Sequence, residues 1–428
     1  MTDHHATESS AGAVLTHLRD NGALVVPLAN GEPTMLLDAI EAAAAREEID
    51  GVTVHQMHAL RDRPYLHGVY GNRLRHVSYF LSHVTRPCFQ AGTVDLVPNH
   101  FSEVFSHMHA RTTDPLVIAA ASPPDRHGYF SLGVSADYTS SFIGRARFFL
   151  EVNSHMPRTF GRNQIHISQV AGWVRNDQPL IGVPPPAMEA DDHTIAGFVA
   201  ERIADGACLQ TGIGAIPNAI MGALAGHSDL GVHTELLSDG LVDLVERGVV
   251  NGVRKLHNRT KVVGTFALGT QRLYDFLHEN TAVEMWSARY VNDPRLLSRE
   301  RNFVSINATL TVDFLGQCAS ETLGGHYYSS SGGQVDFARG AMYSEGGKGF
   351  IVLRSTAASG TVSRIVPQLP AGEVVTNSKN TVDMVVTEFG VAELRTKTVR
   401  ERTTALIAVA HPSHRDHLTA EARRLGYV

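Results

Sequence analysis

The sequence predicts an α/β protein made of two similar open domains, each with a mainly parallel sheet. Apolar runs of strand length alternate with amphipathic helical segments, as in strands joined by crossover helices. At 428 residues, the chain is also too long for one ordinary core. The stretch 176–192 holds four prolines and shows little helical periodicity, which is typical of a semi-rigid spacer. We therefore expect an N-terminal domain over residues 1–190 and a C-terminal domain over 191–428.

Composition narrows the classes of function. Hydrophobic residues make up 43% of the chain and charged residues 19%, which is typical of a globular protein. The net charge of −6 argues against a broad nucleic-acid surface. The three cysteines form no CxxC pair, so a disulfide framework and a zinc–cysteine site are disfavoured, and a cytoplasmic location fits. No window approaches ~18 apolar residues, and the polar residues 1–12, expected to be a frayed tail, carry no export signal. We expect no membrane and no nucleic-acid partner.

Histidine pairs raise the question of a metal site. His55 and His58, or His107 and His109, have spacings that suit ligands, but the chain holds 23 histidines and surface or capping roles are favoured. Asp125 with His127 could form an acid/base pair, but a turn cap beside a loop histidine is favoured. We therefore expect no metal.

The N-terminal half alternates helices and strands. Its most regular segment is an amphipathic helix over 34–46, and the continuous apolar run 116–121 suits a strand covered on both faces. We predict helices over 13–21, 34–46 and 75–83, and strands over 23–27, 52–55, 92–98, 116–121 and 148–152.

The C-terminal half begins a new alternation after the spacer. Asp191 and Asp192 can cap the first helix and Gly206 can end it. We predict helices over 194–204, 218–225, 240–246, 399–409 and 412–425, and strands over 207–210, 230–232, 262–267, 283–286, 303–315, 350–353, 374–376 and 382–387.

Glu235 lies where one of these strands gives way to a helix. The apolar run 230–232 precedes it, and Ser238 and Asp239 can cap the helix that follows. In open α/β sheets this end of the strands faces the ligand crevice. With an ordinary pKa of about 4.3 the carboxylate is ionised at neutral pH and needs no partner base to act as a nucleophile. On residues 231–240 alone, a solvated glutamate near a helix N-terminus is the favoured explanation.

Two glycine loops strengthen the first interpretation. Residues 211–217, Thr-Gly-Ile-Gly-Ala-Ile-Pro, join a strand to a helix and can bring backbone N–H groups close to a ligand. If the strands that end before this loop and before Glu235 are parallel neighbours, loop and acid share one rim. The pattern lacks the third glycine of the dinucleotide fingerprint, which argues against a dehydrogenase. Gly332-Gly333, within a serine-rich loop, also suggests backbone contact with a ligand, although a flexible loop has the same composition.

Several long motifs follow one another along the chain. They are 212–218 (GIGAIPN), 233–240 (HTELLSDG), 291–294 (VNDP), 304–307 (VSIN), 332–337 (GGQVDF), 386–392 (VTEFGVA) and 410–412 (AHP), with 122–125 (SPPD), Gly128 and 153–157 (NSHMP) in the first half. In this order they resemble the acetyl-CoA hydrolase/transferase family of class I CoA-transferases, most closely the 4-hydroxybutyrate and butyrate:acetate enzymes. The resemblance is dense from about 191 onward and thinner before it.

The resemblance implies a fold and a chemistry. It implies two NagB/CoA-transferase-like domains with the active site between them, in a homodimer. It implies that Glu235 attacks an acyl-CoA to give an anhydride and then a glutamyl-CoA thioester, which passes CoA to a small acid such as acetate, butyrate or 4-hydroxybutyrate. It gives Asn292 and Gly333 catalytic roles at the oxyanion. It lines the CoA site with Gln210, Thr211, Gly212, Ile213, Gly214, Leu310, Gly332, Gly333 and Gln334.

Three points stay open at this stage. Glu388 matches a second acid near the site, which a structural ion pair would explain as well. Ser331 stands where relatives often carry isoleucine, and the first hundred residues diverge most, so the identity of the acid is the weakest inference. A hydrolase that uses water as the acceptor, or a non-catalytic protein that binds CoA or a nucleotide, would keep most of the same motifs.

Overall fold

The computed structural model describes residues 7–428, so the first half of the expected polar tail lies outside the described residues. By internal contacts the chain divides into two compact units. Unit 1 comprises the chain up to residue 183 together with 263–291, and unit 2 comprises 184–262 together with 292–428. Each unit combines helices with a mainly parallel sheet, which confirms the α/β class.

The segment 263–291 belongs to unit 1, whereas a single division at residue 190 assigns it to the C-terminal half. Hydrogen bonds explain the difference. Strand β16 (Val283–Met285) pairs in parallel with β8 (Phe160–Gly161), and the Val183 N–H donates to the Gly269 carbonyl at 2.8 Å. Pairing between residues more than a hundred positions apart leaves no local signal in the sequence.

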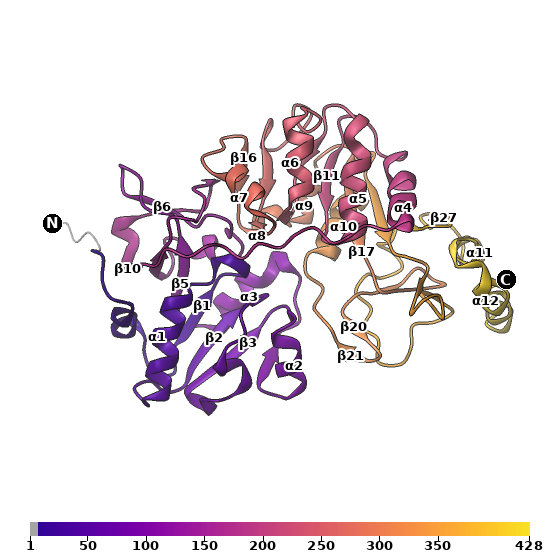
Figure 1. The fold of residues 1–428 in the computed structure, drawn as a ribbon. Helices are drawn as coiled ribbons and strands as arrows, with labels where there is room; N and C mark the ends of the chain where they lie inside the picture. Colours follow the sequence, from indigo (N-terminus) through magenta and orange to yellow (C-terminus); the bar gives the residue numbers. More distant parts are fainter. Residues whose placement is uncertain (1–6) are drawn as a thin grey trace. The chain divides into compact units, whose positions relative to one another are not determined.

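Unit 1 is built on a seven-stranded sheet with the order β10-β7-β5-β1-β2-β3-β4, and all of its pairings are parallel (Figure 1). All six residues of β5 are buried, as the continuous apolar run predicts. The strands are β1 (Ala23–Val26), β2 (Val52–Gln56), β3 (Leu74–Ser78), β4 (Val94–Leu96), β5 (Leu116–Ala121), β7 (Arg147–Val152) and β10 (Val170–Arg175). Among the described residues of this unit, the α-helices are α1 (Thr34–Ala45), α2 (Thr85–Gln90), α3 (Val104–Arg111), α7 (Gln271–Leu277) and α8 (Ala288–Val291).

Unit 2 carries a six-stranded sheet with the order β12-β11-β17-β22-β26-β27, parallel except for the last strand. Helix α10 packs on β17 and β22, and α4 packs on β26 and β27 (Figure 1). The strands are β11 (Cys208–Thr211), β12 (Gly231–Val232), β17 (Phe303–Ala308), β22 (Lys348–Val352), β26 (Met384–Thr387) and β27 (Gly390–Glu393). The main helices are α4 (Ala190–Ala200), α5 (Ala215–Ala223), α6 (Asp239–Glu246), α10 (Gln334–Tyr343), α11 (Val399–Val409) and α12 (Pro412–Arg424).

Several local predictions are wrong. The helix over 75–83 is instead the strand β3, because this segment is the neighbour of both β2 and β4 in the sheet and pairs with each. Residues 374–376 form no strand, although the next residue, Asn377, forms an isolated bridge with Cys318. The single strand over 303–315 is two strands, β17 and β18 (Thr311–Asp313), which belong to different sheets. The single strand over 262–267 is also two strands in different sheets, β14 (Val262–Gly264) and β15 (Phe266–Ala267).

Candidate active site

The carboxyl ends of the parallel strands in unit 2 gather most of the predicted site residues. After β11 the chain runs to β12 on one side of the sheet and later returns to β17 on the other, so β11 is a topological switch point. Ligands of open α/β sheets bind outside the carboxyl ends at such a point. The 212–214 loop follows β11, Glu235 follows β12, and Leu310 follows β17. The prediction that the glycine loop and the acid share one rim is confirmed by the parallel β11–β12 pairing.

The backbone that carries Glu235 is held from two sides. Toward β11, the His233 N–H donates to the Leu209 carbonyl at 2.9 Å, and the Thr234 hydroxyl donates to the Thr211 carbonyl at 3.0 Å. From the other side, the buried Lys255 donates from Nζ to the Val232 carbonyl at 2.8 Å. These bonds fix where the strand ends, and so fix the direction in which the Glu235 side chain leaves it.

Glu235 is deeply embedded but keeps part of its surface accessible. Asn292 donates from Nδ2 to its Oε2 at 2.9 Å, and no other hydrogen bond reaches this carboxyl group from the residues the structure describes. Burial raises the pKa of Glu235 to about 7, and the hydrogen bond from Asn292 opposes that shift. The sequence alone suggested an ordinary pKa. A neutral-pH solution therefore holds the carboxyl group as a mixture of protonated and ionised forms.

Gly333 lies directly against this pair. A Cβ atom added at Gly333 would overlap Glu235 Oε2 and Asn292 Nδ2, and would stand 3.1 Å from the Phe337 ring. The backbone at Gly333 (φ −96°) suits any residue, so space rather than conformation requires glycine here. Gly333 caps the N-terminus of α10, and its N–H makes no hydrogen bond within residues 7–428. An unpaired N–H at a helix N-terminus favours negative charge nearby.

The structure thus brings Glu235, Asn292 and Gly333 into contact. Their arrangement suits attack by a carboxylate on a carbonyl carbon, because the nucleophile, an amide side chain and a free backbone N–H meet at one place. Gln334, at the first position of α10, keeps its buried side-chain nitrogen without a partner in the described chain.

The predicted CoA-loop residues fall into two groups. Ile213, between Gly212 and Gly214, is 66% exposed, and Leu310 is partly exposed at the end of β17, so both are open to a ligand. Gln210 and Thr211 are buried. The Gln210 Oε1 accepts from Ser305 Oγ, Ile306 N and Asn307 Nδ2, which leaves its side chain committed to β17.

Glu388 is not brought to Glu235. It follows β26, four strand spacings or about 19 Å along the sheet from β12. Its carboxylate accepts hydrogen bonds from the backbone N–H and the hydroxyl of Ser355, the former at 2.9 Å.

Lys255 is the residue that sequence reasoning missed. A lysine in a polar loop reads as solvated, and only the packing of its stem against Gly231 shows where it points.

Within residues 7–428, no group of three or more His, Cys, Asp or Glu side chains is placed to hold a metal ion. The spaced pairs His55/His58 and His107/His109 therefore do not extend into a larger ligand set there. None of the described helices is long and apolar enough to cross a bilayer.

Comparison with known proteins gives matches along the whole chain. The acetyl-CoA hydrolase/transferase N-terminal domain matches residues 7–184, and the C-terminal domain of the same family matches 269–422. The succinyl-CoA:cyclohexane-1-carboxylate CoA transferase of Geobacter metallireducens is 45% identical over 96% of this chain and 94% of its own length. The 4-hydroxybutyrate coenzyme A transferase of Clostridium kluyveri is 40% identical over 97% of each chain.

Solved structures agree with the sequence matches. RipA from Yersinia pestis superposes with a TM-score of 0.93 at 38% identity and covers 98% of both chains. The 4-hydroxybutyrate CoA-transferase of Porphyromonas gingivalis superposes with a TM-score of 0.82 at 35% identity, over 97% of each chain.

Proposed function

The chain belongs to the acetyl-CoA hydrolase/transferase family, and we propose that it moves CoA between small carboxylic acids through a glutamyl-CoA thioester on Glu235. Relatives 40–45% identical over nearly their whole length are CoA transferases, so the chain is a CoA-transferase enzyme. The intermediate, the residues that form it and the acids are the subject of the proposal.

The proposed reaction proceeds through two anhydrides and one thioester. Ionised Glu235 attacks the carbonyl carbon of the donor acyl-CoA, and the C–S bond breaks to give an acyl-glutamyl anhydride and CoA thiolate. The thiolate attacks the glutamyl carbonyl carbon, expels the donor carboxylate and leaves a glutamyl-CoA thioester. The acceptor carboxylate attacks that thioester, the thiolate departs, and its attack on the acceptor's carbonyl carbon forms the new acyl-CoA and frees Glu235. No net proton is taken up or released.

The contact of Glu235 with Asn292 and Gly333 carries the proposal. Each attack creates a tetrahedral oxyanion next to the Glu235 carboxyl group, and preorganised donors at that point are usually the largest contribution to such catalysis. The Asn292 amide and the free Gly333 N–H at the start of α10 are the donors within reach. In the proposed CoA site, exposed Ile213 and partly exposed Leu310 contact the ligand directly, and Gln210 positions the strand end.

The acids are proposed from chemistry and kinship. The relatives named above act on 4-hydroxybutyrate and on cyclohexane-1-carboxylate, so the family accommodates acids of different bulk. We propose acetate, butyrate and 4-hydroxybutyrate as the class to test first. A panel that adds succinate and cyclohexane-1-carboxylate shows whether the divergent N-terminal segment or Ser331 has changed the preference.

The test is to trap the intermediate. Purified enzyme is incubated with acyl-CoA alone, quenched with borohydride and digested for mass spectrometry. Borohydride reduces a thioester to an alcohol, so we expect the peptide that holds Glu235 to carry the reduced side chain. An unmodified Glu235 peptide beside active transfer would overturn the proposed intermediate.

Whether the enzyme is a transferase or a hydrolase is tested by measuring how its reaction depends on an added acceptor acid. A thioester on the enzyme conserves its free energy only when water is excluded, so we expect new acyl-CoA only when an acid is added, with parallel-line ping-pong kinetics. CoA release without an acceptor at the same rate would identify water as the substrate.

A cytoplasmic homodimer is likewise proposed from the family, and light scattering of the purified chain tests the dimer.

A further inference from the structure

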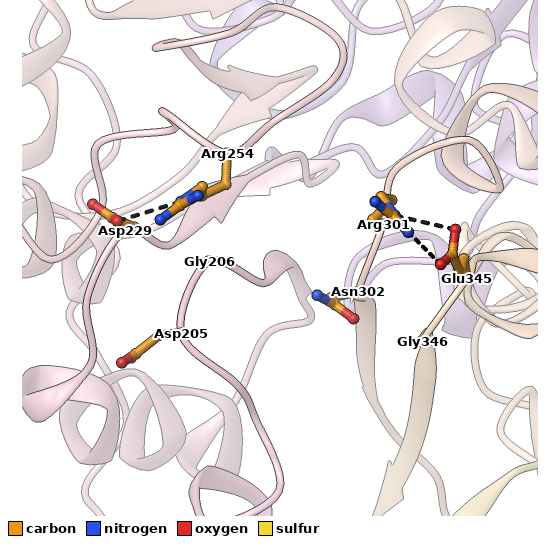
Figure 2. Close-up of a pocket in the computed structure, with 8 residues that line it drawn as sticks. All are labelled: Asp205, Gly206, Asp229, Arg254, Arg301, Asn302, Glu345 and Gly346. Carbon is orange, nitrogen blue, oxygen red and sulfur yellow. Dashed lines mark hydrogen bonds and ion pairs between the residues drawn. The ribbon is translucent and has the colours of Figure 1, made fainter.

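Two polar depressions described in unit 2 lie at opposite edges of its sheet, and their charges are arranged differently. The first lies at the amino ends of the strands, where Gly206 precedes β11, Asp229 precedes β12 and Asn302 precedes β17 (Figure 2). It encloses about 500 Å³. Each of its two arginines is paired with an acid of the same wall: Arg254 with Asp229 at 3.5 Å, and Arg301 with Glu345 at 3.1 Å (Figure 2). The remaining acid of its lining, Asp205, accepts from the Ser228 N–H, so this depression offers an anion no unpaired cation.

The second depression lies at the carboxyl ends, on the same edge of the sheet as Glu235. It encloses about 380 Å³ and begins at Arg354, which follows β22. The hairpin of β23 (Thr356–Ala357) and β24 (Val362–Ser363) forms its wall, with Arg364 just beyond. Its lining residues are Asp191, Arg354, Thr356, Ala357, Ala358, Ser359, Gly360 and Arg364.

The two arginines of this second depression differ. Arg354 is held by Asp192 at 2.7 Å and by Glu189 at 2.8 Å, so its charge is neutralised and its guanidinium is fixed. Arg364 is half-buried, and no hydrogen bond or ion pair joins its guanidinium to another residue of the described chain. Burial, and then the charge of Arg354, lower the pKa of Arg364. A half-buried cation without a hydrogen-bonded or ion-paired partner is costly, and a bound anion would offset that cost.

The acids nearby are largely engaged already. Asp192 and Glu189 are bonded to Arg354, and Glu388, whose charge acts on Arg364, accepts two hydrogen bonds from Ser355. Asp191, on the rim, is exposed. Two hydroxyls, those of Thr356 and Ser359, line the same depression and can donate to an anion.

We propose that Arg364, with the hydroxyls of Thr356 and Ser359, binds a phosphate of the nucleotide end of CoA. Guanidinium groups suit phosphate because they donate two parallel hydrogen bonds. The depression begins at the end of β22, three strand spacings or about 14 Å from β12, which ends just before Glu235. The pantetheine arm bridges that span, with the thiol at Glu235 and the phosphates beside Arg364. This assignment deepens the proposed function and rests on it.

The experiment separates CoA binding from CoA transfer. Calorimetric titration measures CoA, dephospho-CoA and pantetheine against the intact wild-type protein, Arg364→Gln and Arg254→Gln. Arg254 lines the first depression, so its variant is a matched control for loss of one surface arginine. We expect Arg364→Gln to weaken CoA binding roughly tenfold or more, the effect of one lost charged hydrogen bond, and to leave pantetheine binding unchanged. Arg254→Gln should bind all three ligands like the wild type.

Each outcome has one meaning. Dephospho-CoA identifies which phosphate Arg364 binds. If Arg364→Gln binds both CoA and dephospho-CoA more weakly than the wild type, Arg364 contacts the diphosphate; if it binds only CoA more weakly, Arg364 contacts the 3′-phosphate. Either result supports the subsite. Equal CoA affinity in wild type and Arg364→Gln, or an equal loss for pantetheine, overturns it. If the wild type binds CoA through Arg364 but transfers no acyl groups, the proposed function is refuted and the subsite stands. If it transfers acyl groups but its CoA affinity does not depend on Arg364, the subsite is refuted and the proposed function stands.

Discussion

Two carboxyl groups, the partly accessible Glu235 in unit 2 and the fully buried Asp137 in unit 1, have similarly raised pKa values of about 7, and both shifts come chiefly from burial. Their hydrogen bonds differ. Asp137 accepts from the Leu28 N–H at 3.0 Å and from the Thr139 N–H at 2.6 Å, one on each oxygen. Glu235 accepts only from Asn292, on one oxygen, among the described residues.

The difference separates structure from chemistry. Asp137 is fully buried; one of its oxygens closes its own turn and the other ties that turn to the segment after β1. Glu235 leaves one oxygen without a donor and keeps part of its surface accessible beside a glycine. A raised pKa alone therefore marks neither a catalytic nor a structural acid. The two are distinguished by whether an oxygen of the carboxyl group is left without a hydrogen-bond donor.

The largest expected effect is on Glu235. Glu235→Gln keeps the shape and removes the nucleophile, so acyl exchange should fall at least about a thousandfold while CoA still binds. Asp137→Asn is the matched control and should retain transfer. Acyl exchange at a near-normal rate in folded Glu235→Gln would contradict the role of Glu235 as the nucleophile, and with it the distinction from Asp137.

The next effect comes from filling the space beside Glu235. Gly333→Ala puts a methyl group where Glu235 and Asn292 meet, so we expect a loss of transfer of about 10²–10³-fold, comparable with removal of an oxyanion donor. Gly222→Ala, in α5, meets nothing within 4 Å and should leave transfer unchanged and stabilise the helix slightly. Steady-state kinetics and thermal melting distinguish a blocked site from a destabilised fold. Normal turnover in Gly333→Ala would show that the Gly333 backbone takes no part.

The pH dependence tests whether Glu235 acts as the ionised group. Transfer requires the carboxylate, so kcat/KM for acyl-CoA should rise with pH through about 7. Asn292 donates to the carboxylate and so favours ionisation, and Asn292→Ala should move the midpoint upward as well as lower the plateau. A profile that is flat between pH 6 and 8 would mean that Glu235 titrates well below this range.

Much of the fold and the centre of the site could be predicted from sequence because the signals are local. The apolar run 116–121 and the amphipathic segment 399–409 became β5 and α11 with the same bounds, and the strand ends placed Glu235 beside the 212–214 loop. Long-range pairing left no such signal. The segment 75–83 contains a strand because β3 pairs with β2, and 263–291 belongs to unit 1 because β16 pairs with β8. The Lys255 bond to Val232 and the shifted pKa of Glu235 depend on packing that no short stretch encodes.

The smallest effect, and the sharpest test of the comparison, concerns Asp137 and stability. Its pKa is raised to about 7 in the folded protein, against about 3.9 in an unfolded chain, so between these values the folded state binds more protons. Its stabilising contribution is complete below pH 4 and is lost as pH rises through 7. We therefore expect the free energy of unfolding of the wild type to fall over this range, measured by urea denaturation at pH 5 and 7.5. Asp137→Asn removes the titration, so the stability gap between the two proteins should narrow as pH rises. A gap that widens would mean that Asp137 is ionised in the native state, with its two backbone donors outweighing burial, and the resemblance between the two carboxyl groups would then end at their burial.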